Sequence, residues 1–176
     1  ESGVMRPTQI FDAEIEVLAD AAKPVRSRQR VRVHIGTVEA LARIQVLNEA
    51  GEIAEGQKDL VQIRLETSVV AVPCERFIIR RYSPQLTIAG GIVIDNSAVK
   101  HRRKDLSKVR EYLNSLSNTE NSSEKTHLLI TAAGPSGLSF ADLRSRTGLQ
   151  QNLVENATET LISDTEVVKA ERRFVE

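Results

Sequence analysis

The chain has 176 residues with 24 basic and 24 acidic side chains, so its formal net charge at pH 7 is zero. Neutrality argues against a protein that coats nucleic acid through bulk charge, and a single cysteine excludes an internal disulfide or a cysteine-built zinc site. No apolar run approaches the roughly 20 residues of a membrane-spanning helix, so we expect a cytoplasmic protein without a membrane partner. The chain starts at Glu1 without methionine, which predicts that it continues a longer polypeptide.

The first 98 residues have the composition of β structure. They contain 23 valines and isoleucines against 6 leucines, whereas residues 99–176 contain 8 against 10. Because β-branched residues favour strands, the first half is predicted to be β and the second mainly α. Six strand-like runs are separated by turn signals, at residues 10–18, 29–36, 40–47, 60–72, 77–80 and 92–94. Their alternating polarity and short connections favour a six-stranded antiparallel β-barrel over residues 1–98, since closure removes exposed strand edges.

The second half has the order of elements of a winged helix. Residues 99–104 form a basic linker, after which helices are predicted around residues 106–116, 128–130, 140–144 and 150–162. Ser139 is expected to cap the third of these helices, and apolar pairs near residues 167 and 174 indicate a hairpin. This order predicts a winged-helix domain over residues 105–176. The chain as a whole is therefore predicted to be an α+β multidomain protein.

No group of residues predicts an active site. The three histidines are scattered, without the HxxxH or HExxH spacing of a metal site. The segment Gly134-Pro135-Ser136-Gly137 lacks the GxxxxGK[ST] pattern, and its proline removes a backbone donor that a phosphate loop requires. Gly90-Gly91 lies outside any GxGxxG pattern and indicates a bulge or a close backbone approach. We therefore expect no catalytic residue, no metal and no cofactor in this chain.

Basic residues are concentrated in a few places. Residues 21–38 contain five lysines or arginines and no acid. Arg28, Arg30 and Arg32 are expected on one strand face with guanidinium groups about 7 Å apart, near the phosphate spacing of nucleic acid. The same pattern also fits an ordinary solvated face. The candidate phosphate contacts are Arg28, Arg30, Arg80, Arg81, Arg102 and Arg103. With few aromatics, contact with RNA is expected through the backbone.

The last predicted helix begins with residues that can read bases. Gln151 and Asn152 can bind adenine edges. However, Glu155 and Glu159 lie on the same helix without any lysine or arginine, so phosphates would repel it. This pattern favours a structural or protein-facing helix.

The first half resembles the selenocysteine-specific elongation factors of bacteria. The run IGTVEALAR at residues 35–43 is similar to a strand pair of that family, and FIIRRYSP at 77–84 followed by TIAGGIV at 87–93 is similar to its third-domain signature. The elongation factor Tu group has a related phenylalanine–isoleucine–arginine run. The resemblance covers about residues 8–104. It departs from the family pattern at Ala89, where glycine is usual.

The resemblance implies both a fold and a function. The fold would be a barrel like domain 3 of elongation factor Tu, followed by the first of several winged helices. The function would be that of a translational GTPase that delivers selenocysteinyl-tRNA to the ribosome at a stop codon recoded by an mRNA hairpin. GTP and Mg²⁺ would bind to a domain upstream, so this chain alone is not expected to be an enzyme. Downstream winged helices would bind the hairpin, and the barrel would help to hold the tRNA.

Two alternatives stay open at this stage. One is a DNA-binding winged-helix transcription regulator with a β sensor or dimerisation domain, in which Gln151 and Asn152 would contact duplex DNA. The other is an interaction scaffold in which Glu155 and Glu159 pair with a basic partner.

Overall fold

The computed structural model describes residues 5–170 and 173–175, and the chain divides into two compact units. One unit comprises Pro7–Leu113, and the other contains the residues from Asn114 onward. The predicted linker at residues 99–104 thus belongs, by its contacts, to the same unit as the barrel. The outer ends of the predicted domains, residues 1–4 and 176, and residues 171–172 of the predicted hairpin lie outside the described residues. None of the described helices has both the length and the apolar character needed to cross a membrane.

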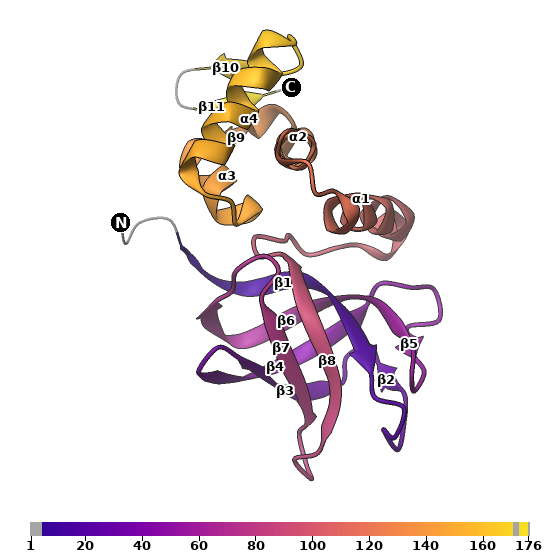
Figure 1. Cartoon of the computed structure of the whole chain (residues 1–176). Helices are drawn as coiled ribbons and strands as arrows, with labels where there is room; N and C mark the ends of the chain where they lie inside the picture. Colours follow the sequence, from indigo (N-terminus) through magenta and orange to yellow (C-terminus); the bar gives the residue numbers. More distant parts are fainter. Residues whose placement is uncertain (1–4, 171–172, 176) are drawn as a thin grey trace. The chain divides into compact units, whose positions relative to one another are not determined.

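Six strands of the first unit close into an antiparallel barrel, as predicted (Figure 1). Around the barrel the strands follow the order β1-β6-β4-β3-β7-β8, and every neighbouring pair is antiparallel. The strands are β1 (Pro7–Val17), β3 (Arg30–Ile35), β4 (Val38–Val46), β6 (Lys58–Val70), β7 (Arg76–Arg81) and β8 (Thr87–Asp95).

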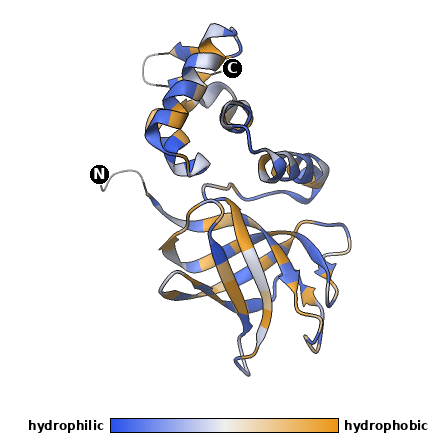
Figure 2. Cartoon of the chain, viewed as in Figure 1, coloured by the Kyte–Doolittle hydropathy of each residue, from blue (hydrophilic) through white to orange (hydrophobic). Residues whose placement is uncertain are grey.

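The barrel closes around an apolar core because its strands alternate in polarity. Hydrophobic and hydrophilic residues follow one another along these strands (Figure 2). In β3, Val31, Val33 and Ile35 are buried while the residues between them face outward. The rings of Phe11 and Phe77 meet edge to face in this core, with centroids 5.3 Å apart.

A short two-stranded sheet flanks the barrel and was not predicted. It pairs β2 (Val25–Arg26) with β5 (Glu52–Ile53), where the sequence indicated only loops and turns. Strands of two residues are too short to display an alternating pattern. Next to these strands, the Ser27 N–H donates to the Gly51 carbonyl at 2.8 Å, and Asn48 Oδ1 accepts from the Gly51 N–H at 2.6 Å. Gly51 has φ +70°, a conformation that favours glycine.

Among its described residues, the second unit contains the helices α2, α3 and α4 and a small antiparallel sheet, in the predicted order of a winged helix. The predicted domain began at residue 105, but residues 106–113 of α1 belong by their contacts to the first unit. The order in the sheet is β10-β11-β9. Ser139 caps α3 through a capping box with Asp142, and Gly148 ends that helix in the left-handed conformation. The elements after the barrel are η1 (Arg103–Asp105), α1 (Leu106–Asn118), α2 (Ser122–Ala133), η2 (Gly134–Ser136), β9 (Leu138–Ser139), α3 (Phe140–Thr147), α4 (Gln151–Ser163), β10 (Val168–Ala170) and β11 (Arg173–Val175).

A buried polar cluster attaches the segment after β8 to the outside of the barrel. Asp12 on β1 lies 2.6 Å from His101 Nε2, with only 1% of its side chain exposed. Gln62 on β6 donates both to Asp12 at 3.0 Å and to the carbonyl of Val99 at 2.8 Å. Burial raises the pKa of Asp12, although hydrogen bonds and the charge of His101 act in the opposite direction. These contacts hold residues 99–101 against the barrel.

Candidate nucleic-acid interface

The structure separates the six predicted phosphate contacts into two groups. Arg30, Arg80 and Arg81 lie on β3 and β7, whereas Arg28, Arg102 and Arg103 line a pocket. The expectation that Arg28 shares a strand face with Arg30 and Arg32 is wrong. Strand β3 begins only at Arg30, and Arg28 has φ +70° in the preceding turn, where its N–H donates to the carbonyl of Ile44 at 2.7 Å.

Arg30 and Arg80 of the first group belong to a set of arginines that lie side by side across four strands, whereas Arg81 pairs with the buried Val31 and lies outside this set. Cross-strand pairing places Arg80 opposite Arg32, and in the next row it places Arg30 opposite Arg43 and Arg43 opposite Arg64. We call these five residues, on the outer side of β7, β3, β4 and β6, the arginine face. Side chains directly opposite one another in a sheet lie about 5 Å apart at Cβ, so this face concentrates positive charge.

Two glutamates and a tyrosine partly compensate the arginine face. Arg30 donates two hydrogen bonds of 2.8 Å to Glu66, and Arg32 pairs with Glu39. The Arg30 hydrogen bonds hold the pKa of Glu66 below its usual range. The guanidinium groups of Arg30 and Arg32 also lie 4.8 and 5.4 Å from the ring centre of Tyr82. Arg30 is therefore already occupied by partners within the protein.

The two remaining predicted contacts on β7 are less engaged. Arg80 Nε donates to Thr87 Oγ1 at 3.4 Å, a long hydrogen bond. The backbone N–H of Arg81 donates to the carbonyl of Leu86 at 2.8 Å, which fixes the start of the loop after β7. Both side chains are partly exposed.

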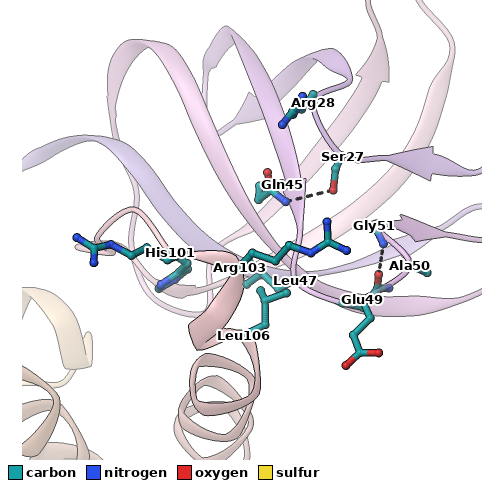
Figure 3. A pocket seen from close by; sticks show the side chains of 12 residues that line it. Ser27, Arg28, Gln45, Leu47, Glu49, Ala50, Gly51, His101, Arg103 and Leu106 are labelled. Carbon is teal, nitrogen blue, oxygen red and sulfur yellow. Dashed lines mark hydrogen bonds between the residues drawn. The ribbon is translucent and has the colours of Figure 1, made fainter.

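The second group lines a cavity of about 370 Å³ that we call the linker pocket. Three segments form it: residues 27–28 after β2, residues 45–51 at and after the end of β4, and residues 101–106 after β8. In Figure 3, Arg103 extends from the start of η1 toward the two neighbouring segments that carry Ser27 and Gly51, while the carboxylate of Glu49 points away from Arg103. The pocket thus presents mainly positive charge.

One wall of the linker pocket is fixed by a charged network. Asn48 Nδ2 donates to Asp59 at 2.8 Å, and Arg110 on α1 donates to Asp59 at 2.6 Å and to the carbonyl of Leu47 at 2.9 Å. Burial alone would raise the pKa of Asp59, but the hydrogen bonds from Asn48, Arg110 and the Leu60 N–H outweigh it and lower this pKa. The wall is therefore held in place before any ligand binds.

The lowered pKa of Asp59 predicts a change in acid stability. A carboxylate of this kind stabilises the fold above its unfolded pKa of about 3.9, and this contribution is lost as the pH falls through the folded value. Asp59→Asn should therefore reduce stability at pH 7 and flatten its fall below about pH 4, as measured by urea unfolding between pH 7 and 2.5. Asp12→Asn is the control, because the pKa of Asp12 is raised and its ionisation therefore changes the stability of the fold with pH in the opposite direction. An unchanged acid limb in Asp59→Asn would contradict the assignment.

The sequence did not indicate several members of these surfaces. Arg43 and Arg64 join the arginine face only through strand register, and Glu66 and Glu39 become partners for the same reason. The alternation within β4 and β6 could have placed these residues outward, but it could not have told which strands are neighbours.

Helix α4 does not have the surface of a duplex-reading helix. Gln151 donates to Glu155 at 2.8 Å, so its amide is engaged by a carboxylate of the same helix. Asn152 and Glu159 are exposed, and the helix carries no lysine or arginine. Among the described residues, no cluster of three or more potential metal ligands is present.

A closed antiparallel barrel followed by a helical unit with a small sheet defines a modular α+β protein. Along residues 12–100 the chain matches the family model described as the selenocysteine-specific elongation factor, beta-barrel domain. The chain therefore belongs to the selenocysteine-specific elongation factor family, and the resemblance noted in the sequence is confirmed.

Two known proteins are similar to the chain over most of its length. The selenocysteine-specific elongation factor of Desulfomicrobium baculatum is 30% identical over 155 residues, which are 88% of this chain and 24% of that protein. The chain thus spans about a quarter of the length of this relative. A crystal structure of a bacterial selenocysteine-specific elongation factor, EF-Sec, matches 99% of this chain and 25% of its own, with a TM-score of 0.64 and 13% identity. At that identity the likeness concerns the fold.

Proposed function

We propose that this chain is part of a translational GTPase that delivers selenocysteinyl-tRNA to the ribosome in the cytoplasm, and that its barrel binds the tRNA backbone. In this proposal GTP and Mg²⁺ bind to an upstream domain, and downstream winged helices bind the mRNA hairpin. The chain itself performs no catalysis. The observation that carries the proposal is the combination of family membership with two arginine-rich surfaces on one barrel.

The chemistry of these surfaces suits a phosphate backbone better than bases. Arginine forms bidentate, charge-assisted hydrogen bonds with phosphate oxygens, and each contact releases counterions. Tyr82 is the aromatic ring at the arginine face, and two guanidinium groups already lie over it. We therefore expect recognition of a folded RNA by its shape and charge.

The proposal is tested by titrating the chain with the selenocysteine tRNA at 50 and 200 mM KCl. We expect binding that weakens strongly with salt, and weaker binding after substitution of Arg30, Arg80, Arg81, Arg28, Arg102 or Arg103. A duplex DNA of mixed sequence is the comparison for the regulator alternative. Failure to bind tRNA at the lower salt would contradict the proposal, and tight DNA binding lost on changing Gln151 and Asn152 would favour the regulator.

The ion pair between Arg30 and Glu66 predicts a substitution that strengthens RNA binding. Glu66→Gln removes the charge that occupies Arg30, so RNA binding should become about threefold tighter at low salt, with a salt slope steeper by about 1. Glu16→Gln on β1 is the matched control, since it removes one exposed carboxylate that pairs with Lys58 at 3.2 Å. Equal effects of both changes would indicate only the net charge, and weaker binding by Glu66→Gln would exclude Arg30 as a contact.

A further inference from the structure

We propose that the linker pocket binds one phosphodiester group of a folded RNA and that the bound phosphate fastens residues 101–106 to the barrel. This inference rests on the proposed function and deepens it. It assigns RNA contact to a defined cavity and adds a structural consequence of binding.

The three arginines that line the linker pocket have no acidic partner among the described residues. Within the described residues, no ion pair or side-chain hydrogen bond engages the guanidinium groups of Arg28, Arg102 or Arg103. By contrast, Arg26 pairs with Glu52 at 3.0 Å, and Arg30 pairs with Glu66. Guanidinium groups that line a cavity without an acidic partner leave its positive charge uncompensated, and a bound anion would neutralise that charge. Arginine is the side chain best suited to hold such an anion when it is a phosphate.

The pocket is shaped before binding. Arg28 has φ +70°, unusual for a residue with a side chain, and two hydrogen bonds hold its backbone there. Its N–H donates to the Ile44 carbonyl at 2.7 Å, and its carbonyl accepts from Arg43 at 3.2 Å. Backbone conformations of this kind are retained where the surroundings enforce them, and they occur often at binding sites. Together with the network around Asp59, this gives two pre-formed walls.

The lining of the pocket suits a phosphate group. A volume of about 370 Å³ is at the lower end of the range for ligand sites, so it leaves room for more than a phosphate alone. Most such sites are apolar, whereas the charged and polar residues outnumber the apolar ones here. The lining consists of Arg28, Arg102, Arg103, His101, Glu49, Ser27, Gln45 and Asn48 together with Leu47, Ala50, Gly51 and Leu106. A single charged group therefore fits the pocket better than an apolar ligand.

The arginines of the linker pocket come from two different segments of the chain, which explains why a bound phosphate would hold residues 101–106 to the barrel. Arg28 belongs to the turn between β2 and β3 of the barrel, whereas Arg102 and Arg103 belong to the segment that leaves it. A phosphate that contacts both sets connects these segments directly. Binding of RNA should therefore reduce the motion of residues 101–106, where η1 leads into α1.

The test compares RNA binding by the whole chain and by single variants. The probe is the selenocysteine tRNA, with inorganic pyrophosphate as a small competitor. Arg103→Ala removes one pocket charge, and Arg28→Asn removes another while keeping a residue that tolerates positive φ. Lys100→Ala is the matched control, because Lys100 is exposed on the same segment but does not line the pocket. Circular dichroism and thermal unfolding verify that each variant is folded. If Arg28→Asn does not fold, Arg103→Ala alone is enough to test the pocket.

We expect Arg103→Ala and Arg28→Asn each to weaken RNA binding at least about fivefold at 50 mM KCl and to reduce the salt slope by about 1, whereas Lys100→Ala changes affinity less than twofold. RNA should also slow hydrogen exchange at residues 101–106 in the wild type but not in Arg103→Ala. Pyrophosphate should compete with RNA in the wild type.

Three results would contradict different parts of the account. If the wild type does not bind RNA at all, the proposed function itself fails. If RNA binding survives both pocket variants, or falls equally in Lys100→Ala, only the pocket assignment fails. Pyrophosphate could slow hydrogen exchange at residues 101–106 while Arg103→Ala leaves the RNA affinity unchanged. In that case the pocket binds a free anion, and its assignment to RNA is overturned.

Discussion

Replacing His101 by alanine should lower the free energy of unfolding of the barrel unit by about 3–5 kcal/mol at pH 7, the usual loss when a buried charged group is left without its partner. Asp12 would keep only the hydrogen bond from Gln62, at 3.0 Å, while its carboxylate stays almost fully buried. An uncompensated buried charge is far more costly than a lost surface contact.

The pH dependence of this variant identifies the cause. Burial raises the pKa of Asp12, and without His101 this pKa should rise further. An acid with a raised folded pKa destabilises the fold most when it is ionised. The stability difference between His101→Ala and the double change Asp12→Asn with His101→Ala should therefore shrink as the pH falls from 7 to 5. Urea unfolding at both values measures this. The double change Asp12→Asn with His101→Ala should lose less stability than His101→Ala alone, and a loss below about 1 kcal/mol in the single variant would contradict the argument.

Gly91→Ala should destabilise the barrel by about 3 kcal/mol, at the upper end of the usual range for overpacking. An added Cβ would lie 2.5 Å from Phe77 Cζ, 2.8 Å from Ile15 Cγ2 and 2.9 Å from the backbone oxygen of Glu14. The side chains are packed in the core, and the backbone oxygen belongs to the adjacent strand β1, so neither can move away easily.

The neighbouring glycine provides the control for this prediction. A Cβ at Gly90 would meet nothing closer than the Phe77 carbonyl oxygen at 4.0 Å, so Gly90→Ala should change stability by no more than about 0.5 kcal/mol. Thermal and urea unfolding of both variants distinguish the two positions. Equal losses of stability in the two variants would show that the steric clash at Gly91 is not the cause of the destabilisation.

Local patterns made the barrel predictable. In β3, Val31, Val33 and Ile35 alternate with outward polar residues, so the strand and its buried side follow from composition and spacing. The glycine pair also indicated a close backbone approach, but only the pairing of Gly91 with Ile15 and Phe77 shows which glycine requires it. The two-residue strands β2 and β5 carry no such pattern and could not be predicted.

The candidate surfaces depend on contacts between distant parts of the sequence. Arg28 and Arg103 are 75 positions apart and line the same pocket only because the segment after β8 returns to the barrel. The sequence identified both as basic but could not place them together. It also gave no sign that Glu66 would neutralise Arg30, because that pair depends on the order of strands around the barrel.

The dependence of tRNA affinity on KCl concentration tests the central claim most directly. If the arginines of the linker pocket and of the arginine face contact RNA phosphates, the logarithm of the association constant should fall linearly with the logarithm of the KCl concentration. The slope should be about −2.5 or steeper, as for three or more phosphates. A flat dependence, or a slope that stays the same when Arg28, Arg102 and Arg103 are all replaced, would contradict the account.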